Sequence, residues 1–197
     1  MRQGIVLYGP PAAGKDTITA ALTEVEPRCG LFQRLKVGSG SFRNYRRGTL
    51  QQLAALSAAG AVIYRNDRYG NMYVVDRPGL DEATSRDQIP VVHLGQLAGI
   101  ETLVNGYPIS WLTVLLWCTR DVTAARSTAR GDQDTAERLK AWDETYADLA
   151  ANPGHLFDLV IRTDSTSPEA SARRIADAAN GLAAHRPVRV DATIPLD

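Results

Sequence analysis

The stretch Gly9-Pro10-Pro11-Ala12-Ala13-Gly14-Lys15-Asp16-Thr17 decides the fold of this 197-residue chain. An apolar run over residues 5–8 precedes it, and a helical pattern over residues 18–25 follows it. A strand, a glycine-containing loop and a helix in this order are typical of a phosphate-binding P-loop, because backbone N–H groups and the positive end of the helix dipole then point at one phosphate chain. The pattern predicts that residues 9–17 bind nucleotide phosphates, with Lys15 bridging the terminal ones. The alternative is a glycine-rich turn with a surface lysine.

One position of the loop departs from the P-loop pattern. Asp16 stands where the pattern has Ser or Thr, whose hydroxyl binds Mg²⁺. A carboxylate is also a good ligand for this hard cation, and Thr17 supplies a hydroxyl one residue further on. Asp16 and Thr17 are therefore the candidate magnesium ligands, although without the ion a carboxylate would repel a triphosphate.

Charge and cysteine content exclude several classes of protein. The 22 Lys and Arg residues balance 22 Asp and Glu residues, so neither nucleic acid nor an anionic membrane is expected as the main partner. Cys29 and Cys118 show no metal-binding spacing, which is typical of a reduced intracellular protein. The N-terminal apolar run is too short for a signal peptide, and no apolar run reaches the ~20 residues of a membrane span. We expect a single cytoplasmic domain over residues 1–197.

Short apolar runs alternate with longer helical patterns, which predicts an α/β fold with a parallel sheet between two layers of helices. The expected core strands are Gly4–Tyr8, Gln33–Val37, Pro90–Leu94, Leu112–Cys118 and Asp158–Arg162. The expected helices are Lys15–Val25, Leu50–Ala59, Leu80–Asp87, Gly95–Val104, Val122–Arg130, Asp134–Ala150 and Pro168–Ala184. Gly60 is a plausible end for the second helix, and the segments Ala61–Tyr64 and Met72–Val75 predict a hairpin in a small inserted lobe. Residues 185–197 predict an extended or frayed end.

Two groups of arginines could bind anions. Three arginines fall within residues 43–47, where their fork-shaped guanidinium groups suit a phosphate or a carboxylate. A solvated basic turn is the alternative. Arg126, Arg130 and Arg138 form a second group around a predicted hinge, Arg130-Gly131-Asp132. They could fold over a transferred phosphoryl group as part of a lid, or they could be ordinary surface arginines on a helix pair.

The order of these features resembles the guanylate kinase family of P-loop nucleoside monophosphate kinases, over about residues 5–178. Residues 43–48 are similar to the family's Arg-x-x-Arg-x-Gly segment, which implies that Arg43 and Arg46 contact the acceptor phosphate. Gly70-Asn71-Met72-Tyr73 is similar to the family's Gly-Asn-x-Tyr and implies a further acceptor contact at Tyr73. Arg130-Gly131 and Arg138-Leu139 resemble the family's lid.

The resemblance implies a P-loop kinase fold with a five-stranded parallel core sheet flanked by helices. It also implies a small acceptor-binding lobe over about residues 38–76 and a helical lid over about residues 122–145. The implied reaction is phosphoryl transfer from ATP, with Mg²⁺, to an anionic small-molecule acceptor. Lys15, Arg130 and Arg138 would then be catalytic, since their charge offsets the charge that develops on the transferred group.

The chain departs from the family where the acceptor base would bind. Tyr64 stands in place of an acidic residue, and a second acidic pair falls on His93 and Gly95. The family's carboxylates accept hydrogen bonds from guanine, so their loss predicts an acceptor other than GMP. Tyr64 and His93 remain candidate acceptor contacts. His93 could also be a base, or simply a histidine that is hydrogen-bonded at a strand end.

Other functions stay open at this point. Ribose-bisphosphate kinases share this layout, so the acceptor could be a sugar phosphate, and an ordinary guanylate kinase is a further alternative. The string Asp76-Arg77-Pro78-Gly79 matches the Asp-x-x-Gly of GTPase switches, but the chain has no Asn-Lys-x-Asp motif. A catalytically inactive nucleotide-binding module is the last alternative. The oligomeric state does not follow from the sequence.

Overall fold

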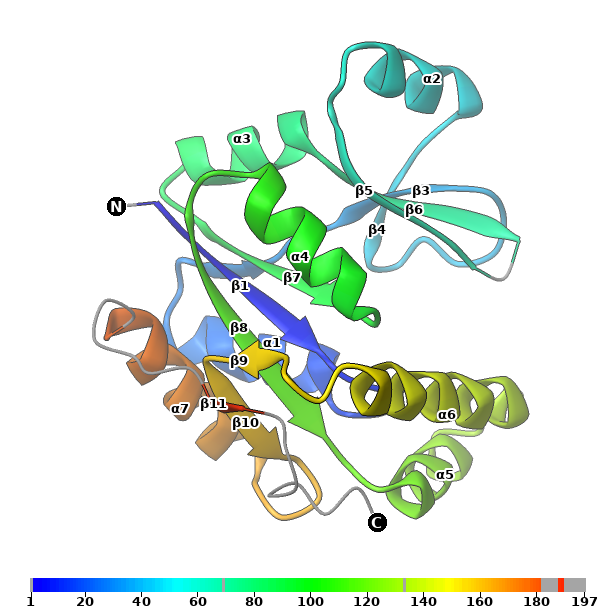
Figure 1. Cartoon of the computed structure of the whole chain (residues 1–197), viewed down its shortest axis with the longest axis vertical. Coiled ribbons are helices and arrows are strands. Elements are labelled where there is room, and N and C mark those ends of the chain that lie inside the picture. The colour runs from blue at the N-terminus through cyan, green and yellow to red at the C-terminus, as the bar shows by residue number, and fades with distance from the viewer. Residues whose placement is uncertain (1, 69, 133, 182–187, 190–197) are drawn as a thin grey trace.

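The computed structural model describes residues 2–68, 70–132, 134–181 and 188–189. At its centre lies a sheet of five strands in the order β10-β8-β1-β7-β2, in which every neighbouring pair is parallel. The strands are β1 (Gln3–Tyr8), β2 (Cys29–Leu31), β7 (Ile89–Leu94), β8 (Ser110–Trp117) and β10 (Leu159–Arg162). The α/β class and the five-stranded parallel core are thereby confirmed (Figure 1).

The prediction of a core strand at Gln33–Val37 is wrong. The strand at this place, β3 (Arg34–Val37), belongs to a second sheet, and the edge strand of the core is β2, which pairs with β7. β2 has three residues with a glycine at its centre. So short a strand has no apolar run from which a sequence pattern could reveal it.

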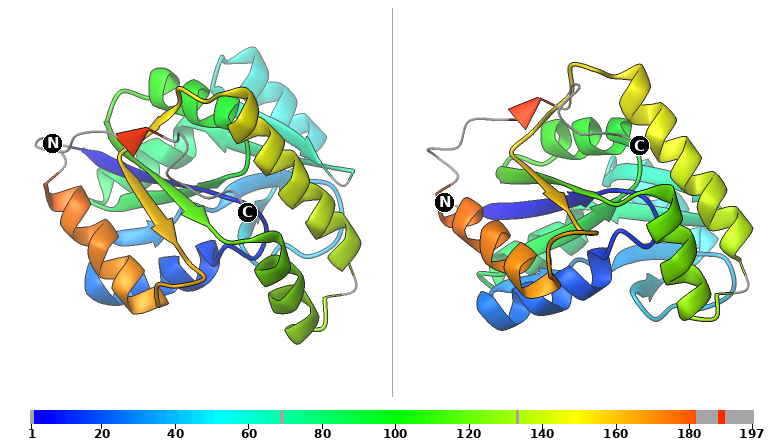
Figure 2. Two further views of the ribbon diagram at one scale, coloured as in Figure 1. Left: turned by 60° about the horizontal axis from the view of Figure 1, so that its bottom comes forward. Right: turned by 90° about the horizontal axis from the view of Figure 1, so that it is seen from below.

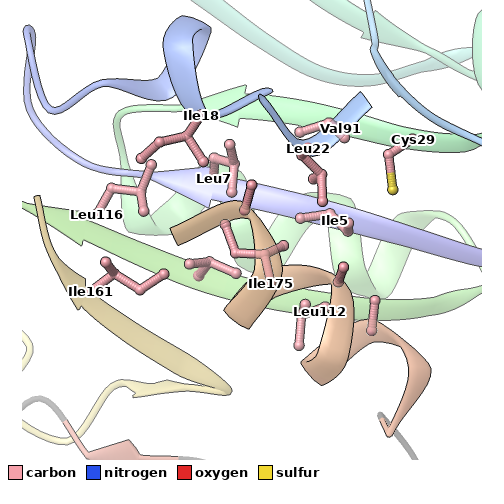
Figure 3. Packing of buried hydrophobic residues seen from close by; sticks show 14 of the residues in the cluster. Ile5, Leu7, Ile18, Leu22, Cys29, Val91, Leu112, Leu116, Ile161 and Ile175 are labelled. Atoms are coloured by element: carbon pink, nitrogen blue, oxygen red, sulfur yellow. The ribbon is translucent and has the colours of Figure 1, made fainter. Parts of the chain in front are cut away.

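Helices cover both faces of the core sheet (Figure 2). The helices are α1 (Lys15–Val25) and α7 (Pro168–Asn180) on one face, and α3 (Arg77–Ser85) and α4 (Leu97–Gly106) on the other. Side chains of β1 alternate between the two faces. Ile5 and Leu7 are fully buried in the cluster beneath α1 and α7 (Figure 3), whereas Val6 and Tyr8 are fully buried in the cluster on the α4 side.

A second sheet of four strands, in the order β4-β3-β6-β5, lies beside the core. Its other strands are β4 (Tyr45–Arg47), β5 (Val62–Arg68) and β6 (Asn71–Asp76), and α2 (Leu50–Ala58) covers it. Leu53 of α2 packs with Leu35, Val37 and Val74 in a small core of its own. The antiparallel β5–β6 pair confirms the predicted hairpin, although both strands are longer than expected. We call this sheet and α2 the small lobe.

Gly60 ends α2 as the sequence predicts. Its φ of +62° is easily adopted only by glycine. Gly60 N–H donates to Ser57 C=O at 3.0 Å and Ala61 N–H donates to Leu56 C=O at 2.8 Å. These two bonds form a Schellman motif, which satisfies carbonyl groups of the last helical turn.

The helices α5 (Arg120–Ala129) and α6 (Thr135–Ala151) form a pair at one end of the molecule (Figure 1). Gly131, with a φ of +71°, turns the chain between them. A second Schellman motif forms here, because Gly131 N–H donates to Thr128 C=O at 2.9 Å and Asp132 N–H donates to Ser127 C=O at 3.1 Å. A turn therefore separates the two helices at Arg130-Gly131-Asp132, and its role as a hinge stays a prediction.

The remaining boundaries differ from the prediction by a few residues. α3 begins at Arg77 instead of Leu80, because the Asp76 side chain accepts the Gly79 N–H and caps the helix. β9 (Leu156–Phe157) pairs antiparallel with β11 (Val188–Arg189), which is the one part of the expected tail within the described residues. The predicted helix ends at residues 182–184 lie outside them. Among the described helices, none combines the length and apolarity of a membrane span.

Candidate nucleotide and acceptor site

The P-loop connects β1 to α1 in a conformation that suits a phosphate. Gly9 has a φ of +152°, and a Cβ placed on it would lie 2.1 Å from the Leu116 carbonyl oxygen. The loop therefore approaches β8 more closely than a side chain at position 9 would allow. Gly14, the N-cap of α1, offers no side-chain cap. The first N–H groups of the helix are thus available to an anionic ligand.

Two side chains of α5 hold the carbonyl groups of the P-loop. Thr123 Oγ1 donates to Pro11 C=O at 3.3 Å, and Arg126 Nη1 donates to Ala12 C=O at 2.9 Å. Arg126 also donates from Nη2 to the Thr163 carbonyl at 2.5 Å. In a trans peptide, N–H and C=O point in opposite directions, so the N–H groups that follow these carbonyls face away from α5. Arg126 is thereby a structural support of the loop.

Lys15 lies over this loop. Its Nζ donates to the carbonyl groups of Gly9 at 2.6 Å and Pro10 at 2.8 Å. Burial lowers the pKa of Lys15 to about 8, while the nearby Asp16 carboxylate acts in the opposite direction. The ammonium group is thus held at the loop by uncharged acceptors, which a phosphate oxygen can replace.

A cavity of about 300 Å³ opens between the P-loop, the small lobe and α6, and we call it the main cavity because Lys15 lines it, not because of its size. The charged residues among the described ones that line it are four cations and two carboxylates. It is lined by Gly9, Pro11, Lys15, Asp16, Leu31, Phe32, Arg34, Asn44, Tyr45, Asn66, Arg68, Tyr73, His93, Leu94, Gly95, Asp134, Arg138 and Thr145. Of the predicted acceptor contacts, the structure brings Tyr73 and His93 to this cavity.

Asp16 and His93 lie next to each other in the lining of the main cavity. Asp16 Oδ1 accepts a hydrogen bond from Asn44 Nδ2 at 3.1 Å and lies 3.7 Å from His93 Nδ1. His93 Nε2 lies 2.8 Å from Thr19 Oγ1. Burial, followed by the charges of Lys15 and Arg34, lowers the pKa of His93 to about 3. His93 is therefore neutral near pH 7 and hydrogen-bonded at the end of β7.

The two candidate magnesium ligands face different cavities. Asp16 lines the main cavity, with a side chain that is 72% exposed. Thr17 lines another cavity of about 380 Å³ between the P-loop, α5 and residues 163–168. No cluster of three or more metal-binding side chains occurs in the described part of the chain. One exposed carboxylate beside a phosphate site nevertheless fits Mg²⁺, which keeps several waters and is usually bound by one or two carboxylates and substrate phosphates.

The structure does not bring Arg43 or Arg46 to the main cavity. Arg43 lines a separate depression beside Asp16. Arg46 forms an ion pair with Asp76, whose side chain is 2% exposed, and donates from Nε to Gln33 C=O at 2.8 Å. Residues 43–47 run along the edge of the small lobe, so their guanidinium groups diverge. Arg43 and Arg46 are therefore not placed together, as two side chains that bind one acceptor phosphate would be.

Arg34 is a cavity cation that the sequence pattern missed. It is the first residue of β3 and lies close to the rings of Tyr45 and Tyr73. No motif marks it, because it begins an ordinary short strand. The alternation of β3 would have placed Arg34 on the same face as Lys36, but the direction of that face depends on the second sheet.

The predicted lid arginines share one carboxylate. Arg130 Nη2 lies 3.0 Å and Arg138 Nε 3.3 Å from the same Asp132 oxygen, and Arg138 also pairs with Asp134 at 2.8 Å. Arg138 lines the main cavity, whereas Arg130 lines the cavity that contains Thr17. Asp132 therefore holds two cations at the junction between the two cavities.

Tyr64 fills the space beside α4 and does not line the main cavity. Its hydroxyl donates to Gln96 Oε1 at 2.5 Å, and its ring lies so close to Gly99 that a Cβ there would be 2.7 Å away. Burial raises the pKa of the Tyr64 phenol. The nearby carboxylate of Asp67 is paired with Arg65 on the exposed side of β5.

No protein-family model matches the sequence, and no curated protein matches it. Among solved structures, guanylate kinase from Anaplasma phagocytophilum is similar with a TM-score of 0.59 and 16% identity, over 92% of this chain and 86% of that chain. The protein APE1195 matches with a TM-score of 0.49 and 14% identity, over 92% and 96%. The YorR protein of Bacillus subtilis, in complex with phosphorylated GDP, matches with a TM-score of 0.48 and 16% identity, over 92% and 98%.

The parallel sheet, the P-loop at the end of its central strand and the flanking helices define a P-loop kinase fold. Within that class, the likeness to the first solved structure is a likeness of fold, and it makes the fold of this chain guanylate kinase-like.

Proposed function

We propose that this protein transfers a phosphoryl group from ATP to a phosphorylated small molecule or a nucleoside monophosphate other than GMP. The observation that carries this proposal is the position of Lys15, which lies at the P-loop and also lines the cation-rich main cavity. A donor phosphate on the loop and an acceptor in the cavity would meet at this side chain. Positioning and charge neutralisation supply most of the rate in such reactions.

The donor would occupy residues 9–17 and the cavity beside α5. That cavity is mainly apolar and is lined by Arg130, Thr163 and Pro168 among others, and this suits the flat base of a nucleotide. Lys15 and Arg138 would contact the transferred group. Mg²⁺, when bound, neutralises charge on the donor phosphates, and Asp16 is the residue that would hold it.

The acceptor would occupy the main cavity between the predicted acceptor-binding segment, over about residues 38–76, and a predicted lid over about residues 122–145. Tyr73 and His93 face this space, and a contact of Arg43 or Arg46 with the acceptor stays a prediction. ATP is an intracellular donor, and the two free, buried cysteines are in keeping with a cytoplasmic protein.

Three features argue against GMP as the acceptor. The Tyr64 hydroxyl is used by Gln96, the cavity has His93 and Gly95 where carboxylates would accept guanine N–H groups, and Asp67 is paired outside it. Each unpaired donor costs about 1–3 kcal/mol. Two lost acceptors therefore lower selectivity for guanine by roughly one and a half to four orders of magnitude, at ~1.4 kcal/mol per tenfold.

The experiment that tests this function is a steady-state assay of ADP release with ATP and Mg²⁺. The acceptors are GMP, AMP, CMP, UMP, sugar phosphates and sugar bisphosphates. We expect turnover with at least one acceptor, and its loss in Lys15→Ala with an unchanged unfolding midpoint. Arg86→Ala, which removes an exposed cation of α3, is the matched control. Retained turnover in Lys15→Ala would refute the P-loop mechanism.

Two other outcomes discriminate among the alternatives. If GMP gives the highest kcat/KM by tenfold or more, the argument from the missing carboxylates fails and the protein is an ordinary guanylate kinase. If the chain binds ADP but turns over no acceptor, it is a nucleotide-binding module instead of an enzyme. The GTPase alternative has lost its support, because the carboxylate of its Asp-x-x-Gly string caps α3 and pairs with Arg46.

A further inference from the structure

Arg34 is the arginine of the main cavity that has no carboxylate partner among the described residues. The other two arginines of the cavity have carboxylate partners: Arg68 forms an ion pair with Glu144, and Arg138 pairs with Asp132 and Asp134. Within residues 2–68, 70–132 and 134–181, the side chain of Arg34 has no ion pair and no hydrogen bond. A half-buried guanidinium group with five N–H donors and no acceptor is unusual, because unpaired buried charge is costly.

Two tyrosine rings hold this guanidinium group in place. Its central carbon lies 5.7 Å from the centroid of Tyr45 and 5.4 Å from that of Tyr73, and the two centroids are 5.1 Å apart. The three distances are similar, so both rings lie on the same side of the guanidinium group, where cation–π attraction favours them, and its N–H donors on the other side stay accessible. The rings therefore restrict the orientation of Arg34 and leave its donors for an acceptor that this part of the chain does not supply.

The surroundings of Arg34 favour an anion. Lys36, on the same face of β3, lies within 5.8 Å of both tyrosine rings and donates to the Ser41 carbonyl at 2.9 Å. The positive charge of Arg34 also repels positive charge on Lys15 and His93, and this repulsion contributes to lowering the pKa values of both residues. An anionic group in the cavity would relieve the repulsion among these cations.

We propose that Arg34 binds an anionic group of the acceptor through its in-plane N–H donors, with Tyr45 and Tyr73 as positioning residues. The anion is a phosphate or a carboxylate of similar size, for which the planar fork of arginine is the matching donor. This inference rests on the proposed function, since it assigns to Arg34 the acceptor contact that the sequence pattern assigned to Arg43 and Arg46.

Inorganic phosphate is the probe for this site. The rise of the unfolding midpoint is measured against phosphate concentration, at constant ionic strength and with saturating ADP and Mg²⁺, so that the P-loop is occupied. The proteins are wild type, Arg34→Gln, Arg34→Lys and Arg65→Gln. Arg65 is the matched control, because it also lies in the small lobe but pairs with Asp67 at the exposed surface.

We expect Arg34→Gln to raise the dissociation constant for phosphate at least tenfold and Arg34→Lys at least threefold, while Arg65→Gln leaves it unchanged. ADP affinity should be unchanged in all three variants. If Arg34→Gln fails to fold, Arg34→Lys decides, since it keeps the charge and loses the fork. The inference is overturned if wild type binds no phosphate, if the decisive variant binds it as wild type does, or if Arg65→Gln weakens it equally.

The two proposals fail separately. If wild type does not bind ADP, the proposed function fails. The phosphate titration is then made in Lys15→Ala, where the P-loop lysine no longer competes for the probe. The same comparison of Arg34→Gln with Arg65→Gln in that background supports or overturns the role of Arg34.

Discussion

Replacement of Gly9 by alanine tests whether the close contact between the P-loop and β8 sets the geometry of the phosphate site. The new Cβ would lie 2.1 Å from the Leu116 carbonyl oxygen, at a φ of +152° that L-residues rarely adopt. Leu116 cannot give way easily, because β8 is paired on both sides, with β1 and with β10. The loop must therefore move.

The cost follows from two effects. Overpacking costs about 1–3 kcal/mol, and a strained backbone position costs about 1–3 kcal/mol, so Gly9→Ala should lose about 2–6 kcal/mol if the loop stays in place. For a chain of this size, one kcal/mol shifts the unfolding midpoint by about 2–4 °C. We therefore expect a drop of roughly 5–20 °C. A loop that swings away would lose less stability, but it would lose ADP affinity, because its N–H groups no longer converge.

Thermal unfolding with and without ADP and Mg²⁺ measures both quantities. Gly30→Ala in β2 is the matched control, since a Cβ there meets nothing within 4 Å. We expect that variant to keep its ADP affinity and to melt close to wild type. A Gly9→Ala protein with the midpoint and the ADP affinity of wild type would refute the reasoning.

Three further changes probe the framework of the site. Asp148→Ala removes the acceptor of the Leu97 N–H of α4 at 2.8 Å, and it leaves the Tyr8 hydroxyl, now bonded to Asp148 at 3.2 Å, with only the Thr145 carbonyl at 3.5 Å. Urea unfolding should therefore reveal a loss of about 1–3 kcal/mol for the unpaired N–H, and an unchanged stability would contradict this. The pKa of His93 falls from 6.5 to about 3 on folding. Between these pH values the unfolded chain binds one more proton at this residue than the folded chain does. The stability of the wild type therefore falls as the pH drops, by at most ~1.4 kcal/mol per pH unit. His93→Gln should flatten this acid dependence in urea unfolding at pH 4–7, and equal slopes in the two proteins would count against it. Arg46→Gln should lower stability by about 3 kcal/mol, because Asp76 loses its partner while almost fully buried, with ADP affinity unchanged; a neutral effect on stability would show that the ion pair contributes little.

Much of the architecture could be predicted because local patterns determine it. The P-loop lies between an apolar run and a helical pattern, and α1 has the predicted bounds, Lys15–Val25. The glycines at positions 60 and 131 end helices in Schellman motifs, which is a local preference for positive φ. β2 was missed for the opposite reason, since its identity as a strand depends on its pairing with β7.

The site was harder to predict than the fold, because the direction of a side chain depends on the sheet that carries it. Arg43 and Arg46 match a motif, yet the edge of the small lobe directs Arg46 to Asp76. Arg34 matches no motif, yet β3 directs it into the main cavity. Likewise, Asp16 and Thr17 are neighbours in sequence but face different cavities, because successive residues of a helix point about 100° apart.

The attachment of the P-loop to α5 through the main chain has a consequence for how this sequence can vary. Pro11 and Ala12 offer carbonyl groups, which every amino acid possesses, whereas Thr123 and Arg126 offer side chains that few amino acids can replace. Random substitution should therefore spare the shape of the loop at position 11, and at position 12 where the new residue tolerates the φ of +59° found there, and should damage it at positions 123 and 126. Homologous chains could diverge at the loop and still keep its form, provided that the helix behind it retained its donors.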